Sequence, residues 1–391
     1  MRSKDRNFFT YFDEKALLFF LVSAMVLAVV LFAIFNSETV PRSKDIIPKL
    51  CNYNRERFFT LLNSDHSGLS ILSKTNQTLT VVLPFYATVS KTLWIRQNHE
   101  IWILDSTNTQ IYVLQTLNMN LVSIISLGKM NCGNVNNFAY NQQAWKNPIT
   151  GKLSGQVWAT CSSSNETVVI DTNTRAVMGT IVIPAAIAGT NFPDSVAVGP
   201  GMGFVVYFPN VWYSYSTTPP FNVIAHGNTP GNAAAAMTHV WRGTDNKNHA
   251  DLYVSTSVST IVKFTWNEFM HVQFIRPIPF LAHALTTSLS EEFLYIIFEG
   301  NNLLYIFHTE DMTVVPGSGT SLNVVLPVAS SFAIGQRNTE MIVTDVSSFT
   351  SLILNLNTGT GKPTGTFITI DADINSVDSI RFVQECPCHF C

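Results

Sequence analysis

The sequence predicts an all-β fold, a closed seven-bladed β-propeller, preceded by one transmembrane helix. Three observations lead to this prediction. Short runs rich in Val, Ile, Tyr, Phe and Thr alternate with Gly, Asn, Ser and Pro turns over most of the chain. These runs recur in units of four with a period of about fifty residues, as in propeller blades. Near its start the chain has an uncharged segment long enough to cross a bilayer.

The composition favours a β-rich protein outside the cytosol and argues against a nucleic-acid partner. Of the 391 residues, 46% are hydrophobic and only 13% are charged, whereas an average soluble domain carries about 25% charged residues. The formal net charge is −3, and there is no long basic run. Binding to a phosphate backbone requires clustered Lys and Arg side chains. We therefore expect no nucleic-acid partner.

Residues 16–36 are predicted to form a transmembrane signal anchor. The stretch from Ala16 to Phe35 contains no charged residue, and at about 1.5 Å rise per residue it spans a hydrocarbon core of about 30 Å. A cleaved signal peptide is the alternative, although its apolar region is usually about 7–15 residues long. Four basic residues precede the span and three follow it, which favours a cytosolic N-terminus. They are Arg2, Lys4, Arg6 and Lys15, then Arg42, Lys44 and Lys49.

These features divide the chain into five predicted parts. They are a cytosolic tail, the signal anchor, a stem, the propeller and a Cys-rich tail, at residues 1–15, 16–36, 37–56, 57–385 and 386–391. The protein is then a single-pass membrane protein whose propeller is lumenal, extracellular or on a virion surface. Asn76 and Asn165, which begin N-x-T sequons, are the glycosylation candidates on that side.

The six cysteines all follow the predicted span, as expected in an oxidising compartment. They are Cys51, Cys132, Cys161, Cys386, Cys388 and Cys391. Ring closure would bring Cys51 to the three C-terminal cysteines, which predicts a terminal disulfide. Cys132 and Cys161 flank a long insertion and could form a second bridge, although spacing alone does not fix the pairing. The C-x-C-H-x-C tail also suits zinc, but we expect disulfides there, and no metal or other cofactor.

The repeat is clearest in the third strand of each predicted blade. The marker residues are Ile71, Val113, Val169, Ser214, Val262, Tyr305 and Ile353, at separations of 42, 56, 45, 48, 43 and 48 residues. The separation of 56 has a local cause, because residues 140–156 form a polar insertion that reads as one long loop. Six complete blades are predicted to begin near Thr92, Phe138, Ser195, Ala234, Ala284 and Phe332.

Ring closure accounts for the remaining strands. Three strands, at 58–63, 68–73 and 79–84, stand before the first complete blade, and one strand, Ser379 to Gln384, follows the last. One plus three completes a seventh blade and leaves no exposed sheet edge at the chain ends. The blade that begins at Ser195 is the least regular, because its third strand at 211–216 is polar, so six blades remain the alternative.

One predicted unit carries a recognisable repeat pattern. The matching residues are Ile170-Asp171-Thr172-Asn173-Thr174, Gly179-Thr180-Ile181 and Val196-Ala197-Val198-Gly199-Pro200, with weaker echoes at 103–106 and 332–335. This order of an I-D-T strand end, a T-N turn, an A-T-I strand and a V-A-V strand resembles the YVTN-type repeats of surface-layer and related seven-bladed β-propellers. The resemblance implies a fold and not a reaction.

No catalytic constellation stands out, so we expect no enzyme activity. Candidate residues for the mouth of the central channel are Asn191, Asp194, His239, His283 and Asp378. Each also has a structural explanation, because an isolated His or Asp on a strand is usually hydrogen-bonded locally. Candidate aromatic anchors for a protein or glycan partner are Trp145, Trp212, Tyr213 and Tyr215. Ordinary packing between blades is the alternative for Trp212.

The predicted function is a membrane-anchored, non-enzymatic propeller that acts as a binding or structural surface module. The alternative is a metal-dependent hydrolase or lactonase-like enzyme with its site at the channel mouth. A structural component of a viral or cellular envelope is a third possibility. The expected partners are the membrane, through residues 16–36, and a protein or glycan ligand.

Overall fold

The computed structural model describes most of the predicted propeller. The described residues are 58–63, 69–73, 79–81, 89–105, 109–115, 120–128, 132, 135–147, 151, 153–161, 163–187, 191–199, 201–231, 233–244, 247–266, 270–288, 292–298, 301, 303–319, 329–334, 340–345, 350–371 and 374–376. Contacts divide the chain into two units, Glu56–Glu385 and the two ends together, and all described residues belong to the first. Among them, no helix is long and apolar enough to span a bilayer. The predicted anchor at 16–36, the stem and the terminal tails lie outside the described ranges.

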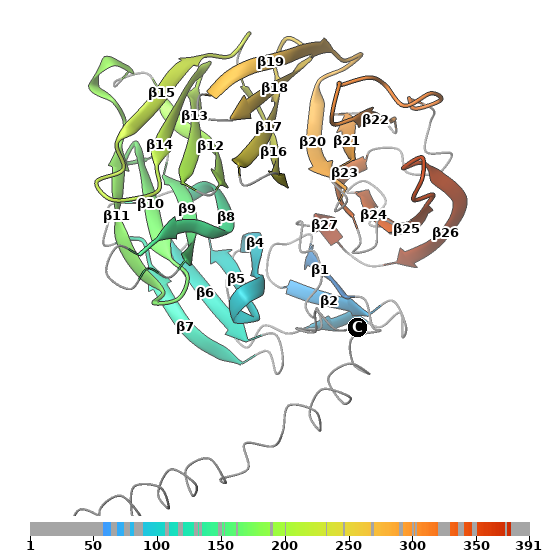
Figure 1. Ribbon diagram of the computed structural model, residues 1–391. Helices are drawn as coiled ribbons and strands as arrows, with labels where there is room; N and C mark the ends of the chain where they lie inside the picture. The colour runs from blue at the N-terminus through green and yellow to red at the C-terminus, as the bar shows by residue number, and fades with distance from the viewer. Residues whose placement is uncertain are drawn as a thin grey trace, which may run out of the picture. The chain divides into compact units, whose positions relative to one another are not determined.

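The described strands form seven antiparallel sheets, six of four strands and one of three (Figure 1). The first complete sheet contains β4(Val89–Ile95), β5(Glu100–Asp105), β6(Gln110–Gln115) and β7(Leu121–Ser126). The second contains β8(Val135–Lys146), β9(Leu153–Cys161), β10(Glu166–Asp171) and β11(Ala176–Val182). The third contains β12(Phe192–Gly199), β13(Met202–Phe208), β14(Val211–Ser216) and β15(Val223–Asn228).

The remaining sheets continue the same meander. The fourth contains β16(Ala233–Thr244), β17(Lys247–Thr256), β18(Thr260–Trp266) and β19(Met270–Pro277). The fifth contains β20(Ala282–Thr287), β21(Phe293–Phe298) and β22(Leu304–His308). The sixth contains β23(Ala329–Ile334), β24(Glu340–Asp345), β25(Thr350–Leu356) and β26(Pro363–Asp371). The seventh joins β27(Ile374–Ser376) to β1(Phe58–Asn63), β2(Leu69–Ser73) and β3(Leu79–Val81).

The burial of a strand depends on its position in the sheet. Second strands such as β5 and β21 are buried along their whole length, as their continuous apolar runs require. Fourth strands such as β7 and β15 are largely exposed. The first strands β4, β8, β12, β16, β20, β23 and β27 contact one another in succession and lie toward the middle of this unit in Figure 1. Each sheet therefore packs its faces against its neighbours.

The seventh sheet confirms that strands from the two ends of the propeller region pair. Residue Leu62 of β1 pairs with Ser376 of β27, and Asn63 pairs with Ile374. The three N-terminal strands are those predicted from the sequence. The closing strand differs, because β27 follows β26 almost directly, whereas the prediction placed it at 379–384, which lies outside the described residues. All seven marker residues of the repeat lie in the third strand of their sheets.

The insertion at residues 140–156 is not the loop that the sequence suggested. The hairpin of β8 and β9 extends through it, with Trp145 paired to Ser154. The Trp145 indole N–H and the Ser154 hydroxyl both donate to the carboxylate of Asp171, at 3.3 and 2.7 Å. Because Asp171 ends β10 of the same sheet, these hydrogen bonds hold the extension against its own sheet.

Apolar side chains fill the spaces between successive sheets. The fully buried Trp158 of β9 lies directly over Gly203 of β13 in the next sheet. A methyl group at position 203 would stand 2.2 Å from the indole ring. Glycine is therefore required here by the close approach of a neighbouring side chain to the backbone.

A polar contact joins the second strand of the first sheet to the turn after β10. The buried carboxylate of Glu100 accepts a hydrogen bond from the indole N–H of Trp102 at 2.9 Å and forms an ion pair with Arg175. Beside it, the amide of Asn98 donates to the backbone carbonyl of Thr172 at 2.6 Å. Buried polar groups need such partners, so this junction has a defined register.

The same arrangement recurs at later junctions. Gln156 accepts from the indole of Trp158 at 2.9 Å and donates to the carbonyl of Thr217, which follows β14, at 2.7 Å. Tyr253 donates its hydroxyl to the carbonyl of Thr309, which follows β22, at 3.2 Å. The threonine after a third strand is thus a repeated docking point for the preceding sheet.

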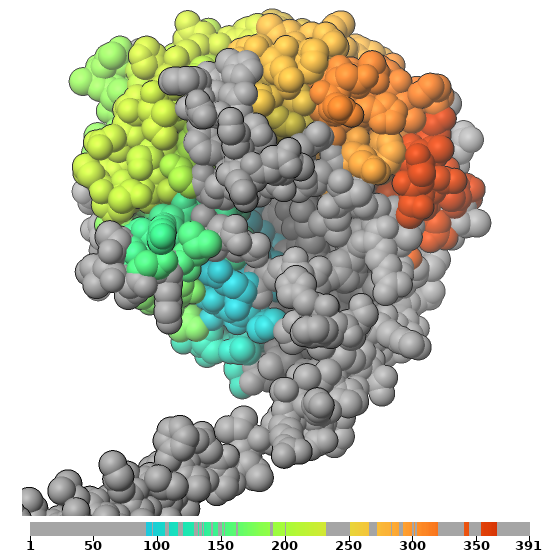
Figure 2. Space-filling model, in the orientation of Figure 1, coloured from blue at the N-terminus to red at the C-terminus, as the bar shows by residue number. Residues whose placement is uncertain are grey.

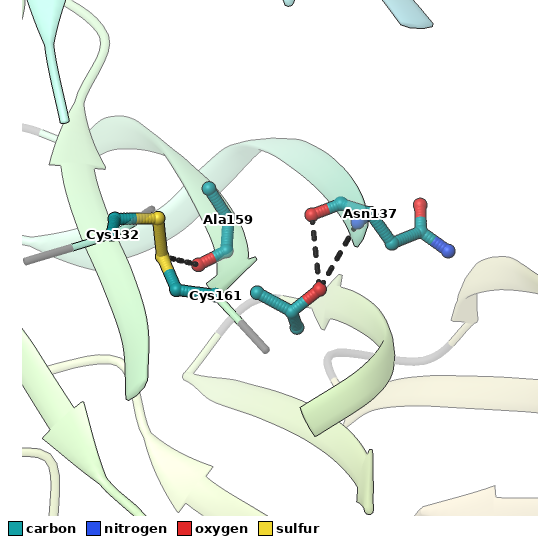
Figure 3. Close-up of a disulfide and its surroundings, with 5 residues drawn as sticks. Cys132, Asn137, Ala159 and Cys161 are labelled. Carbon is teal, nitrogen blue, oxygen red and sulfur yellow. Dashed lines mark hydrogen bonds between the residues drawn. A yellow bond between two sulfur atoms is a disulfide. The ribbon is translucent and has the colours of Figure 1, made fainter. Parts of the chain in front are cut away.

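Cys132 and Cys161 form a disulfide, as the sequence suggested (Figure 3). Cys161 ends β9, and Cys132 lies in the connection that leads into β8. Both are fully buried. The four other cysteines lie outside the described residues, so the terminal disulfide stays a prediction.

Candidate functional site

The first strand of each sheet pairs irregularly with the second strand near its own N-terminal end. In β12, Pro193 pairs with Tyr207 and Ser195 pairs with Val206. Asp194 therefore has no counterpart in β13 and is an extra residue. In β20, His283 is extra in the same way, between Ala282 and Ala284. One extra residue in one strand of an antiparallel pair is a β-bulge, and bulges are frequent at the rims of closed sheets and beside functional sites.

Six of the seven first strands have a single-residue bulge at this position. The bulge residues are Ser90, Asn136, Asp194, His283, Ser330 and Asn375. All six are polar. We call this set the bulge ring, and the end of the sheets that carries it the bulge end. Two of the predicted channel-mouth residues, Asp194 and His283, belong to it.

The fourth sheet breaks this pattern. Between the pairs Ala233 with Thr256 and Met237 with Val254, β16 has two residues more than β17. The residues in this interval, 234–236, are all alanine. The bulge ring is therefore polar at six positions and lacks a polar residue at the seventh.

Side chains of three neighbouring sheets meet near the bulge ring. Lys91, next to the bulge of β4, donates from Nζ to Oδ1 of Asn137 on β8 at 2.8 Å. Lys91 is also close enough to Asp194 on β12 to favour its ionised form. Ser195 donates to Asp194 at 3.4 Å. A cation, an amide, a carboxyl group and a hydroxyl thus come together from β4, β8 and β12.

The environment of Asp194 is partly desolvated. Burial raises the pKa of its carboxyl group above the usual value of 3.8, while the hydrogen bond from Ser195 and the charge of Lys91 act in the opposite direction. Desolvation is the largest effect because a carboxylate loses hydration in a low-dielectric surrounding. Perturbed carboxyl groups of this kind are common at functional sites.

The other predicted channel-mouth residues do not belong to this ring. Asn191 precedes β12 and donates its amide to the carbonyl of Ile187 at 2.6 Å, which shapes the entry to the strand. His239 pairs with Leu252 in the middle of the β16–β17 hairpin and is not at a bulge position. Asp378 lies outside the described residues.

Three of the predicted aromatic anchors are buried, which corrects their assignment as anchors and agrees with the packing alternative for Trp212. Trp212, Tyr213 and Tyr215 are only 5%, 7% and 2% exposed. The ring of Trp212 packs against Phe204 and Phe264, with centroids 5.3 and 5.4 Å apart. These side chains fill the spaces beside the third sheet, so they cannot contact a partner.

Trp145 and Asn165 remain partly accessible. Trp145 is half-buried, and its indole N–H is used within its own sheet. Asn165 is half-buried at the turn between β9 and β10, with a positive φ of 55°. The roles of Trp145 as an anchor and Asn165 as a glycan acceptor stay predictions, and Asn76 lies outside the described residues.

The described residues contain no group of three or more His, Cys, Asp or Glu side chains that could hold a metal ion. The carboxyl group of Asp194, a member of the bulge ring, interacts with the hydroxyl of Ser195 and the ammonium group of Lys91. Among the residues that the structure describes, the arrangement at the bulge end therefore suits hydrogen bonding to a ligand better than metal coordination. The predicted zinc alternative at 386–391 falls outside this part of the chain.

Four residues of the bulge ring were not predicted from the sequence. Ser and Asn are common in turns and give no signal by residue type. The only signal was positional, because predicted blade starts such as Thr92 and Phe138 follow the bulge residues Ser90 and Asn136 by two positions.

Comparisons with known proteins identify the fold only. No family model and no curated protein matches this sequence. A solved structure of a Lactobacillus plantarum protein has a TM-score of 0.59 at 12% identity, covering 82% of this chain and 98% of that one. A Bacteroides uniformis protein assigned as a 6-phosphogluconolactonase also reaches 0.59 at 12% identity, with coverages of 81% and 97%.

A third similar structure is the dihydro-heme d1 dehydrogenase NirN, with a TM-score of 0.51, 8% identity and coverages of 82% and 74%. At such low sequence identity, the activity of these proteins cannot be assigned to this chain. The shared feature is the arrangement of consecutive antiparallel sheets. The described part of this chain therefore has a β-propeller fold.

Proposed function

We propose that this chain is a seven-bladed, non-enzymatic β-propeller that binds its partner at the bulge end. The observation that carries the proposal is the bulge ring, in which six of the seven first strands have a polar extra residue after their first or second residue pair. A bulge interrupts the ladder and leaves backbone groups of the extra residue outside it. Six repeats of such a feature at one end offer hydrogen-bonding groups to a ligand there.

We also propose that residues 16–36 hold the propeller at a membrane. The supporting observations are the uncharged segment itself, the buried disulfide between Cys132 and Cys161, and the sequon at Asn165. Disulfides persist mainly in oxidising compartments. Resistance of the full chain to extraction by alkaline carbonate, with protease access to the propeller from outside, is the expected result. Release into the soluble fraction would contradict the anchor.

Site-specific photo-cross-linking tests which end binds. A benzophenone side chain is introduced into the full chain at Ser257, an exposed turn residue at the bulge end, or at Thr358, an exposed turn residue at the opposite end. Irradiation in the native membrane should give a discrete adduct from position 257 and none from position 358. Adducts from position 358 alone, or none from either, would contradict the proposal.

A lactonase-like hydrolase is the second candidate function. It is favoured by the fold likeness to a protein assigned as a 6-phosphogluconolactonase and by the desolvated carboxyl group of Asp194 next to Ser195 and Lys91. A carboxyl group with a raised pKa can exchange protons nearer neutral pH. The test is hydrolysis of phosphorylated sugar lactones by the full chain and by Asp194→Asn. Turnover that this substitution abolishes would replace the binding proposal, and absence of turnover in the wild type removes the hydrolase.

A further inference from the structure

A continuous series of loops runs along the bulge end from the third sheet to the fifth. The carbonyl of Asn210, after β13, accepts a hydrogen bond from the backbone N–H of Thr229 at 2.8 Å. Two residues further on, Gly231 packs against the side chain of Val258, so closely that a methyl group at position 231 would stand 2.8 Å from it. The carbonyl of Ser259 then accepts from the N–H of Ile278 at 2.9 Å.

Three large apolar side chains are exposed along this series. Phe208, Val258 and Phe280 are 38%, 56% and 42% exposed. Phe208 ends β13, Val258 lies in the turn after β17, and Phe280 lies in the connection to β20. We call these three residues the apolar ridge. The third, fourth and fifth sheets, which carry it, succeed one another in yellow-green, gold and orange in Figure 2.

The two aromatic rings of the ridge are held from one side. Phe208 stacks on Phe192, with centroids 5.0 Å apart and planes inclined by 13°. Phe280 packs edge-to-face on the buried ring of Phe298 at 5.8 Å. The stack with Phe192 covers one face of the Phe208 ring, and 38% of the Phe208 side chain is still exposed to solvent. Aromatic rings fixed in this way bind a ligand with little loss of side-chain entropy.

The aromatic side chains of Phe208 and Phe280 also lie near residues of the bulge ring. Phe192 and Phe208 form the first pair of the β12–β13 ladder, and the pair of Pro193 and Tyr207 lies between them and the bulge at Asp194. Phe298 is in the pair directly before the bulge at His283. The segments that form the ridge, 208–210, 229–231, 257–259 and 278–281, contain no Asp, Glu, Lys or Arg. Their polar groups are the amide and hydroxyls of Asn, Thr and Ser.

We propose that the apolar ridge and the adjacent part of the bulge ring bind a neutral saccharide. This assignment rests on the proposed binding function and specifies the class of its ligand. A pyranose ring has an apolar face of C–H groups and a rim of hydroxyls. The exposed part of the Phe208 ring suits the apolar face of the sugar, and the polar residues of the bulge ring suit its hydroxyls. Phosphorylated or strongly acidic ligands would need cations, and the ridge segments contain none. An apolar peptide is the competing occupant, and it is separated from the saccharide by experiment.

The test uses the full chain in nanodiscs and a set of neutral mono- and oligosaccharides, with saturation-transfer NMR to detect binding. Phe208→Ala and Phe280→Ala should each weaken binding of the responding saccharide at least tenfold, and Phe208→Trp should retain it. Leu153→Ala is the matched control, because Leu153 is 56% exposed at the start of β9, at the end of its sheet opposite the bulge; it should leave affinity unchanged. All three positions are exposed at the surface, so circular dichroism should show a folded chain.

Two results would overturn the saccharide site. One is absence of binding to every neutral saccharide at millimolar concentration. The other is saccharide binding that neither ridge substitution changes. If position 257 still yields a cross-linked partner in either case, the binding function stands and only the saccharide assignment fails. If that adduct proves to be an apolar peptide segment lost in Phe208→Ala, the peptide is the occupant. If neither cross-links nor saccharide binding occur, the binding function fails as well.

Discussion

Loss of the buried cation at the junction of the fourth and fifth sheets should destabilise the propeller strongly. Lys263 of β18 is only 2% exposed, and its ammonium group lies 3.2 Å from a carboxylate oxygen of Asp251 on β17. It also donates to the backbone carbonyls of Thr309 and Glu310, in the next sheet, at 2.7 and 3.1 Å. Replacement by Met keeps the length of the side chain and removes these charge-assisted contacts.

The expected size of the effect follows from what Lys263→Met leaves behind. The carbonyl of Thr309 keeps the hydroxyl of Tyr253 as a donor, so the main cost falls on the carboxylate of Asp251, which loses its cation while buried. Removing one partner of a buried ion pair costs about 3–5 kcal/mol. Replacing both partners, in Lys263→Met/Asp251→Leu, should recover most of this loss, because a buried pair and an apolar pair of similar volume are often equally stable.

Urea unfolding of the full chain, followed by tryptophan fluorescence, measures the free energy of unfolding of the single and the double variant. With a slope of about 3 kcal/mol per molar urea, the midpoint of Lys263→Met should fall by about 1 M or more. Lys146→Met, at an exposed position, should change the free energy of unfolding by about 0.5 kcal/mol or less. The reasoning is refuted if the free energy of unfolding falls in the double variant by the sum of the losses in Lys263→Met and Asp251→Leu, since the pair would then have no coupling energy.

Three further changes test other parts of the fold. Cys132→Ala/Cys161→Ala should lower the free energy of unfolding by about 3.6 kcal/mol, the loop-entropy value for a bridge across 29 residues, and non-reducing mass spectrometry should detect the bridge in the wild type. Gly203→Ala should cost about 3 kcal/mol or more, because its methyl group would meet the buried ring of Trp158; chemical denaturation measures the loss. Asp194→Asn should become more stable relative to wild type as pH rises above 3.8, because the raised pKa of Asp194 penalises the folded carboxylate once the unfolded one ionises; thermal unfolding as a function of pH measures the difference.

Each of these three changes has a result that would contradict it. Equal stability of the disulfide variant and wild type under oxidising conditions would mean that the bridge does not constrain the unfolded chain. Gly359→Ala is the control for the glycine substitution, since its nearest new contact would be an ordinary 3.5 Å; an equal loss there would show a general effect of replacing glycine. A pH-independent difference for Asp194→Asn would show that burial does not perturb this carboxyl group.

The strand pattern of the propeller was predictable because it depends on local periodicity. Marker residues such as Val113 and Val169 lie in the third strands where the repeat placed them, since buried strands between polar turns leave a strong signal. The polar run at 211–216 forms a strand despite its composition. Its Tyr and Trp side chains are buried by the neighbouring sheets, a tertiary effect that no local window contains.

The errors at the aromatic residues and at the insertion have one cause. Residue type indicates what a side chain can do, but its exposure depends on the neighbouring sheet. Trp212 lies between rings of the third and fourth sheets, and Trp145 is held by Asp171, which is 26 residues away along the chain. Neither distance along the sequence nor hydropathy identifies these partners. The closing strand was misplaced for a related reason, because a three-residue strand such as β27 has almost no periodicity.

The bulge ring shows why the candidate site could be located only in part. Asp194 and His283 attracted attention because their side chains can titrate, whereas Ser90 and Ser330 are residues of a kind found in any turn. What the members share is an extra residue after the first or second pair between the first and second strands of the sheet, and this register depends on which strands pair. A single His or Asp on a sheet is weak evidence of function. The repetition of a polar bulge on six first strands, interrupted only where β16 carries alanines, is stronger evidence, because sheet packing alone does not require polar residues at those positions.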